Sequence, residues 1–589
     1  MPLEGSGVAK LRVLVANRGE IAVRVIRTCR ELGIPTVAVY SDADRDALHV
    51  ELADRAYRIG PPPPTQSYLN VAVILEAAAK GKATAVHPGY GFLAENPDFA
   101  RACADAGLTF IGPPPEAMEM MGDKAAARRA AERIGVPVIP GISDPVGAEE
   151  AKKIAGGIGY PLAVKAAFGG GGRGMQLVEN PDGLAEAVER SAREAQSYFG
   201  RPEVYLERYI TRAHHVEAQI IADARGNFSF LGERDCTLQR RYQKLVEESP
   251  SPVVDRDLRT RIGDAALAVA KEAGYVNAGT VEFLVDDDRS FYFLEMNTRL
   301  QVEHPVTEMV AGVDMVRLQI DVALGEKVEL APALRGHAIE CRINAEDPAH
   351  DFTPAPGLVT RFRPPTGPFV RVDAGITEGR AIPGEYDSLF CKLLAWGENR
   401  EAARRRMLRA LDEFEVEGVP TTIPFYRWVL DTLTFIEASH TTKWVERVLA
   451  EGNFPPAASG EEEIRVEPAP SGAGPASAAS RVVVEVNGRR IPVRVWGEDL
   501  PSAPAPPAGD SHGIHALGAD SVAAPMQGTI LKVMVEEGQE IRSGDVICIL
   551  EAMKMENHVT AAHDGRVRQV AVKAGDVVEI GQVLVTLGE

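Results

Sequence analysis

The C-terminal part of the chain contains an internal repeat with a fixed glycine spacing. Three glycines recur 37 residues further along the chain: Gly528, Gly538 and Gly544 in the first copy, and Gly565, Gly575 and Gly581 in the second. The gaps are 10 and 6 residues in both copies, and apolar and polar residues alternate between the glycines. This is the period of half-buried strands joined by glycine turns. Two such units predict a small flattened β-barrel with internal two-fold symmetry.

Lys554 lies midway between Gly528 and Gly581, in the predicted turn that joins the two halves. A lysine in an exposed turn can simply make a hairpin more soluble. Here Met553 and Met555 flank it, and large apolar side chains in an exposed turn indicate a surface that another protein contacts.

The Ala-Met-Lys-Met turn at 552–555 resembles that of the biotin carboxyl carrier domain, in which the lysine is modified. Lipoyl domains share the barrel but usually lack both methionines. The resemblance implies biotin attached covalently to Lys554, and a biotin protein ligase as the partner that attaches it.

The bulk composition is that of a multidomain soluble protein. The 589 residues are 45% hydrophobic and 25% charged, with a formal net charge of −20 from 64 basic and 84 acidic residues. This charge argues against non-specific binding to nucleic acid or to anionic membranes. The six cysteines are scattered without a Cys-x-x-Cys spacing, so we expect neither a disulfide framework nor a zinc site. With no signal-peptide pattern and no run of 18 apolar residues, we expect a cytoplasmic protein.

Strand and helix patterns alternate over roughly the first 120 residues. The predicted elements are strands at 11–17, 36–40, 83–86 and 108–111 and a helix at 20–32. This alternation predicts a parallel, Rossmann-like α/β sheet. Helical and hairpin patterns follow, and a third mixed α+β block extends to about residue 450.

The predicted domain boundaries follow these changes of pattern: 8–122, 123–330, 336–450, a linker at 451–520, and the barrel at 521–589. The linker is rich in Pro, Ala, Gly and Ser, and only 481–496 is predicted to be ordered, as a hairpin around Asn487-Gly488. About 65 flexible residues span roughly 45 Å, which would let the barrel reach two distant sites. A passive spacer is the alternative.

A glycine-rich segment, Gly169–Gly174, lies between two predicted strands at 162–166 and 175–178. It lacks the Gly-Lys-Ser/Thr ending of a P-loop, and no helix follows it. We interpret it as a hairpin lid whose backbone amides close over phosphates while Lys165 supplies a charge. The alternative is a flexible loop without a ligand.

Two glutamates are predicted to face each other across a second hairpin. Strands at 281–285 and 291–297 flank a polar turn, and a bend between Asp288 and Arg289 places Glu282 opposite Glu295. Such neighbours have Cβ atoms about 4.5–5.5 Å apart, where like charges are unfavourable. A cation would resolve the conflict, and Asn297 on the same face would complete three oxygen donors for Mg²⁺. A solvated acidic face is the alternative, which the apolar neighbours disfavour.

The segment that follows, Asn297-Thr-Arg-Leu-Gln-Val-Glu-His-Pro305, resembles the biotin carboxylase signature of the ATP-grasp superfamily. The resemblance extends along most of residues 11–450. Further matching segments are Ala16–Glu20, His87–Asn96, Gln239–Arg241, Gln243-Lys244 and Arg342–Asp347.

This resemblance implies roles for individual residues. ATP would be bound by Lys124, Lys165, Gly170, Gly171, Gly172, Met175, Glu207, His215 and Gln239. Mg²⁺ or Mn²⁺ would be bound by Glu282, Glu295 and Asn297. Bicarbonate would be bound by Lys244, Arg299, Gln301 and Val302, with Glu303 as the base and Arg342 facing the ureido oxygen of biotin. His215 taken alone would more often be a core histidine than a nucleotide ligand, so its assignment rests on the resemblance. Tyr242, where the family commonly has histidine, is assigned no role.

The two resemblances together imply the α chain of an acyl-CoA carboxylase of the acetyl- or propionyl-CoA type, an enzyme of lipid metabolism. It would use ATP and bicarbonate to carboxylate biotin on its own carrier domain. A separate carboxyltransferase β subunit would complete the reaction in an oligomeric complex, since we find no second large catalytic region. The alternatives are an inactive ATP-grasp scaffold that only carries biotin, and a lipoyl-carrier fusion.

Overall fold

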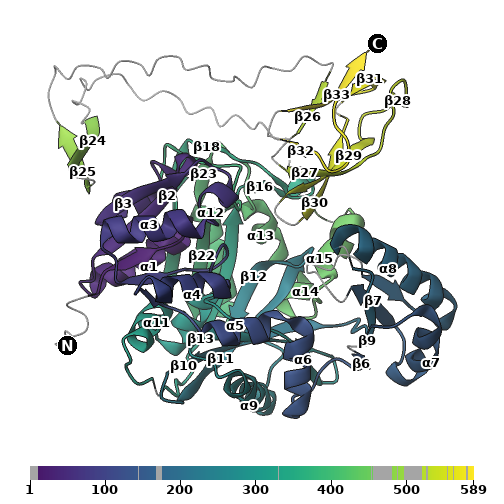
Figure 1. Cartoon of the computed structure of the whole chain (residues 1–589), viewed down its shortest axis with the longest axis horizontal. Coiled ribbons are helices and arrows are strands. Elements are labelled where there is room, and N and C mark those ends of the chain that lie inside the picture. The colour runs from purple at the N-terminus through teal and green to yellow at the C-terminus, as the bar shows by residue number, and fades with distance from the viewer. Residues whose placement is uncertain are drawn as a thin grey trace.

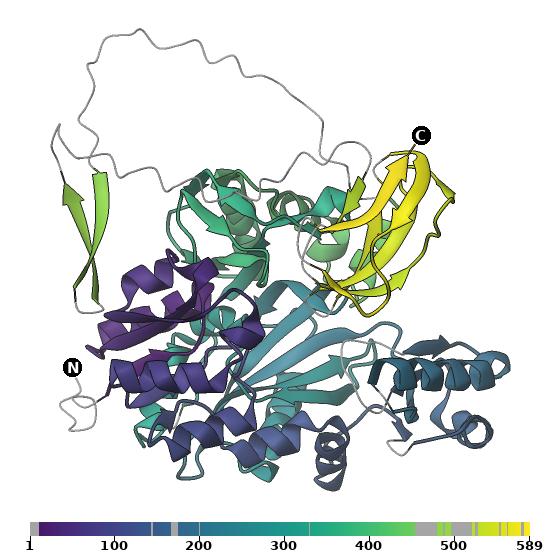
Figure 2. The same ribbon diagram turned by 45° about the horizontal axis from the view of Figure 1, so that its top comes forward.

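The structure is a computed structural model that describes residues 11–142, 145–166, 175–199, 201–328, 330–452, 454, 480–486, 489–495, 521–524, 528–552, 555–561, 563–578 and 582–588. The N-terminal α/β domain lies beside a large central sheet that continues into the green C-terminal domain, and a smaller domain with α7 and α8 projects from one side (Figure 1). The C-terminal barrel is the separate yellow body in Figure 2. The predicted multidomain α/β and α+β architecture is confirmed.

The N-terminal domain is built on a five-stranded parallel sheet in the order β3-β2-β1-β4-β5. Its strands are β1 (Val13–Val15), β2 (Thr36–Ser41), β3 (Arg55–Gly60), β4 (Ala85–His87) and β5 (Thr109–Phe110). Its helices are α1 (Gly19–Glu31), α2 (Leu48–Leu52), α3 (Val71–Gly81), α4 (Pro97–Asp105) and α5 (Pro115–Gly122). Both β1 and β4 are fully buried, as expected for parallel strands covered by helices on two faces. The predicted Rossmann-like sheet is therefore present.

The projecting domain holds a four-stranded antiparallel sheet in the order β6-β9-β7-β8. Its elements are β6 (Gly141–Ile142), α7 (Ala148–Ile158), β7 (Leu162–Ala166), β8 (Gln176–Val178), α8 (Leu184–Phe199) and β9 (Val204–Arg208), preceded by α6 (Lys124–Arg133). Strands β7 and β8 pair antiparallel, with Leu162 opposite Val178, so the glycine-rich segment connects two paired strands as predicted. Gly170, Gly171 and Gly172 themselves lie outside the described residues.

An eight-stranded sheet in the order β14-β13-β10-β11-β12-β15-β22-β20 forms the centre of the molecule. Its strands are β10 (His214–Ala222), β11 (Phe228–Arg240), β12 (Gln243–Ser249), β13 (Asn277–Val285), β14 (Phe291–Asn297), β15 (His337–Asn344), β20 (Val370–Ala374) and β22 (Leu389–Gly397). The helices that connect or cover them are α9 (Arg256–Glu272), α10 (His304–Ala311), α11 (Met315–Ala323) and α12 (Arg400–Glu413). Glu247 of β12 pairs with Glu340 of β15, so the sheet is continuous across the junction predicted at 330–336. The second and third predicted domains thus share one sheet.

The hairpin of β13 and β14 pairs Glu282 with Glu295, as predicted, but the route to this register differs. Near the turn, Phe283 lies opposite Phe293, so the bend itself is centred one half-residue earlier than expected. A bulge at Leu294 then shifts the register and brings Glu295 opposite Glu282. Without the bulge, the partner of Glu282 would be Leu294.

The C-terminal domain packs further strands and helices against the central sheet. They are β16 (Glu346–Asp347), β17 (Thr353–Pro354), β18 (Gly357–Val359), β19 (Arg361–Arg363), β21 (Arg380–Ile382), β23 (Glu415–Glu417), α13 (Ile423–Val429), α14 (Leu433–Ile436) and α15 (Trp444–Ala450). An aromatic cluster fills the core, in which Phe425 contacts the rings of Phe352, Tyr426 and Trp428. These contacts fix α13 against β15, because the Tyr426 hydroxyl also donates to the Arg342 carbonyl at 2.5 Å.

The barrel at the C-terminus consists of two four-stranded sheets, β26-β33-β31-β28 and β30-β29-β27-β32. Its strands are β26 (Ser521–Ala523), β27 (Gly528–Val533), β28 (Glu540–Ile541), β29 (Val546–Ala552), β30 (Met555–Thr560), β31 (Gly565–Val570), β32 (Val577–Val578) and β33 (Val583–Gly588). The predicted symmetry is present: β27, β28 and β29 correspond to β31, β32 and β33, and each half contributes its short strand to the sheet of the other half. Gly538 and Gly575 occupy equivalent turns with φ of 89° and 92°, a conformation that glycine adopts without strain. Lys554 lies outside the described residues.

The hairpin predicted in the linker is present as β24 (Ser480–Val486) and β25 (Arg489–Val495), in which Val486 pairs with Arg489. All six cysteines are buried and none forms a disulfide, as expected. Within the described part of the chain, no helix has the length and apolar character needed to cross a bilayer.

A buried ion-pair network at Glu248 gives the C-terminal domain a testable pH dependence. Its carboxylate accepts from Arg400 Nε at 2.6 Å and Nη2 at 2.9 Å, and lies 2.7 Å from His337 Nε2. Burial alone would raise the pKa of Glu248, but Arg400 and His337 lower it from 4.5 to about 2. The stabilisation is therefore complete above pH 4.5 and is lost as the pH falls toward 2.

We expect Glu248→Gln to lower the free energy of unfolding at pH 7 by about 3 kcal/mol, and by progressively less below pH 4.5. Urea unfolding followed by tryptophan fluorescence measures this, because Trp396, Trp428 and Trp444 lie in this domain. Glu417→Gln, at a 65% exposed side chain, is the control and should change little. A penalty that stayed constant between pH 7 and pH 3 would contradict the assignment.

Candidate functional site

Polar side chains line one face of the central sheet although the strands that carry them are buried. On β10, His215, Glu217 and Gln219 alternate with apolar residues and so point to the same face. Glu217 lies directly opposite Glu282 of β13, and Glu282 lies opposite Glu295 of β14. Buried charges on adjacent strands are unfavourable unless cations lie among them.

Lys244, on β12, is the cation at the centre of this face. Its ammonium lies 2.5 Å from Glu217 Oε2, 3.1 Å from Glu282 Oε1 and 2.5 Å from Glu303 Oε1. Burial alone would lower the pKa of Lys244, but these three carboxylates raise it well above its usual value. Lys244 therefore stays charged and holds together strands β10, β12 and β13 and the start of α10.

Glu303 is fully buried at the position that precedes α10. Its second oxygen accepts a hydrogen bond from Arg342 Nη2 at 3.0 Å, opposite the bond from Lys244. Burial would raise the pKa of Glu303, but Lys244 and Arg342 together hold it well below its usual range. The carboxylate is therefore ionised and can accept a proton only when these cations are drawn away from it.

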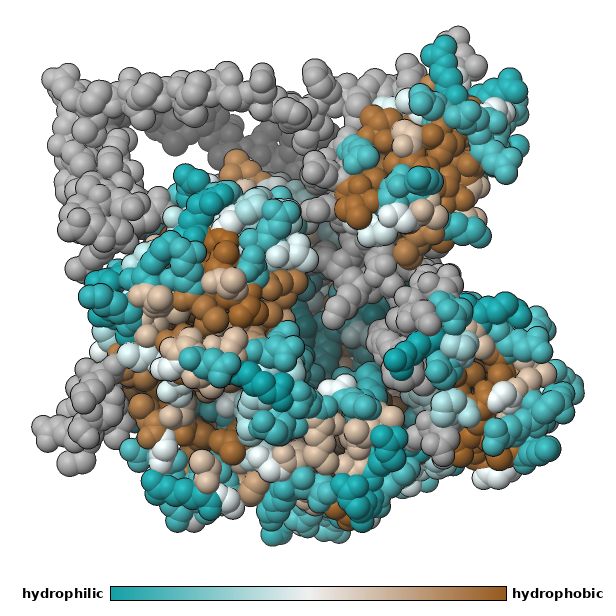
Figure 3. Space-filling view, viewed as in Figure 1, coloured by the Kyte–Doolittle hydropathy of each residue, from teal (hydrophilic) through white to brown (hydrophobic). Residues whose placement is uncertain are grey.

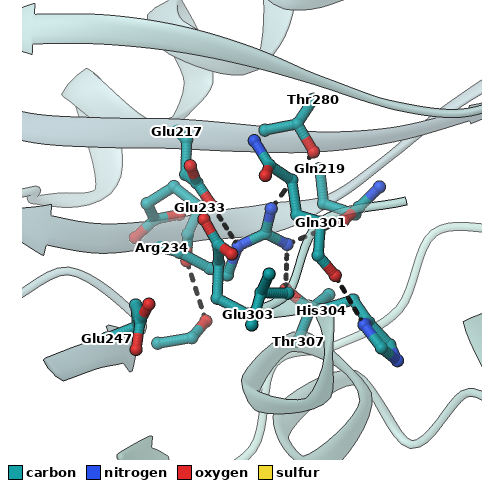
Figure 4. Close-up of polar contacts among 12 residues, drawn as sticks. Glu217, Gln219, Glu233, Arg234, Glu247, Thr280, Gln301, Glu303, His304 and Thr307 are labelled. Atoms are coloured by element: carbon teal, nitrogen blue, oxygen red, sulfur yellow. Dashed lines mark hydrogen bonds and ion pairs between the residues drawn. The ribbon is translucent and has the colours of Figure 1, made fainter. Parts of the chain in front are cut away.

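Arg234 neutralises the acidic face from the neighbouring strand β11. Its side chain is completely buried, and Figure 4 shows the guanidinium directed at Glu217, Gln219, Thr280 and Thr307. The distances are 2.5 Å to Glu217 Oε1, 2.7 Å to Gln219 Oε1, 3.1 Å to Thr280 Oγ1 and 2.9 Å to Thr307 Oγ1. Arg234 thus satisfies Glu217 from one side while Lys244 does so from the other.

Arg299 extends the charged face toward solvent. It donates to Gln301 Oε1 at 2.8 Å and to Asn297 Oδ1 at 3.0 Å, and its Nε contacts Glu95 Oε2 at 2.9 Å. Glu95 comes from the N-terminal domain, so this contact joins the two domains at the rim of the site. Lys244, Arg299, Glu303, Arg342 and Gln301, which we call the Glu303 cluster, are therefore brought together as expected for neighbours in one site.

The three residues expected to bind metal are held on adjacent strands. Glu282 Oε1 accepts from Asn297 Nδ2 at 2.8 Å and Gln301 Nε2 at 3.1 Å, while Glu295 lies 3.1 Å from Lys124. The donor set of two carboxylates and an amide oxygen fits a hard divalent cation such as Mg²⁺ or Mn²⁺. Side-chain donors already contact the Glu282 carboxylate, so Glu282 would have to give up some of these hydrogen bonds to bind the cation.

His215, expected at the nucleotide, contacts the acid pair directly. Its Nε2 lies 2.9 Å from Glu282 Oε2, and its Nδ1 lies 3.5 Å from Gln239 Nε2. Burial would lower the pKa of His215, but Glu282 raises it. His215 therefore links the predicted nucleoside residue Gln239 to the predicted metal ligand Glu282.

Lys165 and Glu207, also expected at the nucleotide, pair with each other in the projecting domain. Lys165 Nζ lies 2.6 Å from Glu207 Oε2, and Arg128 donates to Glu207 Oε1 at 3.0 Å. Met175 immediately precedes β8, and Val302 contributes its carbonyl to a contact with Lys392. Lys165 and Glu207 therefore lie on a different sheet from the strands of the Glu303 cluster, whereas Val302 is next to Glu303 in the chain.

Several residues of the site escaped the sequence analysis: Glu217, Arg234, Glu247 and Lys392. The alternation of His215, Glu217 and Gln219 within an otherwise apolar strand was a signal for the first. Glu247 binds Arg342 Nε at 2.6 Å, and the fully buried Lys392 lies on β22, opposite Arg342 of β15. Those two positions depend on pairing between distant strands, which no local pattern indicates.

Comparison with protein families finds four matches along the chain. They are the biotin carboxylase N-terminal domain at residues 9–118, the carbamoyl-phosphate synthase L chain ATP-binding domain at 123–331, the biotin carboxylase C-terminal domain at 340–447 and the biotin-requiring enzyme domain at 520–587. Together they span both the central sheet and the C-terminal barrel.

Curated relatives match over nearly the full length. The biotin-dependent acyl-coenzyme A carboxylase alpha3 subunit of Mycobacterium leprae is 48% identical over 97% of this chain and 98% of its own length. The propionyl-CoA carboxylase alpha chain of Ruegeria pomeroyi is 39% identical over 97% and 99%. Among solved structures, the biotin carboxylase domain dimer of Hydrogenobacter thermophilus 2-oxoglutarate carboxylase, in complex with MgADP, ADP and bicarbonate, is similar with a TM-score of 0.70. It is 47% identical and covers 74% of this chain and 97% of that one.

Proposed function

Since this chain belongs to the biotin-dependent acyl-CoA carboxylase alpha subunits, and is thus an ATP-dependent biotin carboxylase fused to a biotin carrier domain, we propose that the Glu303 cluster is its active site. One observation carries this proposal. Glu303 is an ionised carboxylate with no exposed surface, held between Lys244 and Arg342. A buried base held beside two cations suits a substrate that is itself a small anion.

Bicarbonate is a poor electrophile and a weak nucleophile, so it must lose a proton to react with ATP. On binding near Lys244 and Arg299, the anion adds a negative charge that offsets the cations around Glu303, and the pKa of Glu303 rises from its depressed value. Glu303 then accepts the bicarbonate proton. The resulting dianion attacks the γ-phosphorus of ATP, the bond to the β–γ bridging oxygen breaks, and ADP and carboxyphosphate form.

The other predicted residues orient the nucleotide and the acceptor. Lys124 and Lys165 would lie along the phosphates, with Glu207, His215 and Gln239 at the nucleoside and the glycines 170–172 with Met175 forming the lid. Mg²⁺ or Mn²⁺ held by Glu282, Glu295 and Asn297 would neutralise charge on the phosphate oxygens. Biotin would supply the ureido nitrogen that accepts the carboxyl group, and the phosphate released from carboxyphosphate would take the ureido proton. Arg342, kept rigid by Glu247, would bind the ureido oxygen.

We expect Glu303→Gln to lower bicarbonate-dependent ADP release by about 10²–10⁴-fold, because the amide cannot take the proton. A coupled assay of ADP release, with bicarbonate and biotin each omitted in turn, measures this. ADP binding by calorimetry should stay nearly unchanged, and Glu326→Gln, at an exposed residue, is the matched control. If wild type releases no ADP in response to bicarbonate and biotin, the chain is instead an inactive scaffold that carries biotin.

We propose Lys554 as the residue that carries biotin. The support is its position between the two symmetric halves of the barrel, where β29 ends at Ala552 and β30 begins at Met555. A chain isolated after co-expression with a biotin protein ligase should show one biotinyl addition by intact mass. The addition should be absent in Lys554→Ala and present in Lys532→Ala, and a lipoyl addition at Lys554 would contradict the proposal.

We propose that a separate carboxyltransferase β subunit transfers the carboxyl group to acetyl-CoA or propionyl-CoA, in an oligomeric complex. The names of the relatives in Mycobacterium leprae and Ruegeria pomeroyi support an acyl-CoA acceptor. When the affinity-tagged chain is purified from the organism that produces it, such a subunit should co-purify. The purified complex should carboxylate a short acyl-CoA. Carboxylation of a 2-oxo acid in place of every acyl-CoA tested would contradict this assignment.

A further inference from the structure

Lys392 is a completely buried lysine that the proposed reaction does not use. It lies on β22 and is paired across strands with Arg342 of β15 on one side and Asp373 of β20 on the other. Directly paired residues point to the same face of a sheet. Lys392 and Arg342 are therefore neighbours on the face that carries the Glu303 cluster.

The two cations contact consecutive residues of one loop. Arg342 Nη2 binds the Glu303 carboxylate at 3.0 Å, and Lys392 Nζ donates to the Val302 carbonyl at 2.9 Å. That carbonyl belongs to the peptide unit whose other end is the Glu303 nitrogen. Lys392 thus fixes the main chain of the base, while Arg342 fixes its side chain.

The ammonium of Lys392 is also tied to the first domain. It forms an ion pair of 3.2 Å with Glu20 in the first turn of α1, and their side chains are 0% and 2% exposed. The end of β20 lies close against the start of α1. A Cβ added to Gly375, the residue after β20, would lie only 2.4 Å from the Glu20 nitrogen. Burial raises the pKa of Glu20 to about 7 although Lys392 acts to lower it. The Glu20 carboxylate is therefore poorly solvated and depends on Lys392 for its charge.

We propose that Lys392 is a positioning residue for the base Glu303, and that it couples the position of Glu303 to the packing of α1 through Glu20. This inference rests on the proposed function, since it assumes that Glu303 removes the proton of bicarbonate. A shift of about 1 Å in a catalytic group can cost about 10²-fold in rate, so a contact to its main chain has a measurable effect.

The test uses the full chain with three variants: Lys392→Met, Glu20→Gln and the double variant. Lys392→Met removes the donor to Val302 and leaves Glu20 unpaired, so both kcat and the thermal midpoint should fall. In the double variant both members of the Glu20–Lys392 pair are absent, so the midpoint should recover part of the loss seen in Lys392→Met, while buried Glu340 and Asp373 still lack the lysine charge. Its kcat should stay at least tenfold below that of Glu20→Gln, with ADP affinity within about twofold, because the Val302 carbonyl still lacks its donor.

Recovery of kcat together with the thermal midpoint in the double variant would overturn the inference, because the lysine would then be only structural. An unchanged kcat in Lys392→Met would do the same. Glu303→Gln is measured in parallel, so that failure of the proposed base can be distinguished from failure of the proposed positioning role. If Glu303→Gln keeps its activity, the proposed base is wrong; if it is inactive while the double variant matches Glu20→Gln, only the positioning role is wrong.

Discussion

The site depends on the balance of charge around one buried ammonium. Lys244 contacts Glu217, Glu282 and Glu303, which come from separate segments of the chain and would repel one another without it. Arg234 and Arg342 complete the balance from the adjacent strands β11 and β15. Taking such groups out of water is costly, and that cost is offset only when each carboxylate keeps several donors. The same arrangement makes the cluster responsive to an added anion or cation, since either one redistributes the existing contacts.

The position of the cluster follows from the continuity of the central sheet. Strands β10 to β14 belong to the region that matches an ATP-binding domain, whereas β15, β20 and β22 belong to the C-terminal region. Because β12 and β15 pair directly, Lys244 and Arg342 approach Glu303 from strands on either side of that junction. The two cations that contact Glu303, the proposed base, are thus held by one continuous sheet, and Glu303 itself lies at the start of α10 beside it.

Local patterns were sufficient to predict much of this. The alternation of strands and helices gave the N-terminal sheet, and the turn at 286–290 gave the opposition of Glu282 and Glu295. The prediction of this pair assumed a regular hairpin, whereas in the structure a bulge at Leu294 brings Glu295 opposite Glu282. Residues whose importance comes from distant strand pairing, such as Lys392 and Arg234, have no sequence signature, because nothing near them in the chain shows which charge they will meet. The metal ligands Glu282, Glu295 and Asn297 followed from the hairpin geometry, whereas most ATP ligands and the bicarbonate ligands came from family resemblance.

The exchange of short strands between the two halves of the barrel has a mechanical consequence. Strand β28 lies in the sheet of the second half, and β32 lies in the sheet of the first. Neither half can therefore detach or melt without breaking the other, so the domain should lose its structure in a single cooperative step. Strands β29 and β30, which flank the proposed biotin attachment at Lys554, belong to this cooperative unit, so they move by rotation and translation of the whole unit and not by local fraying.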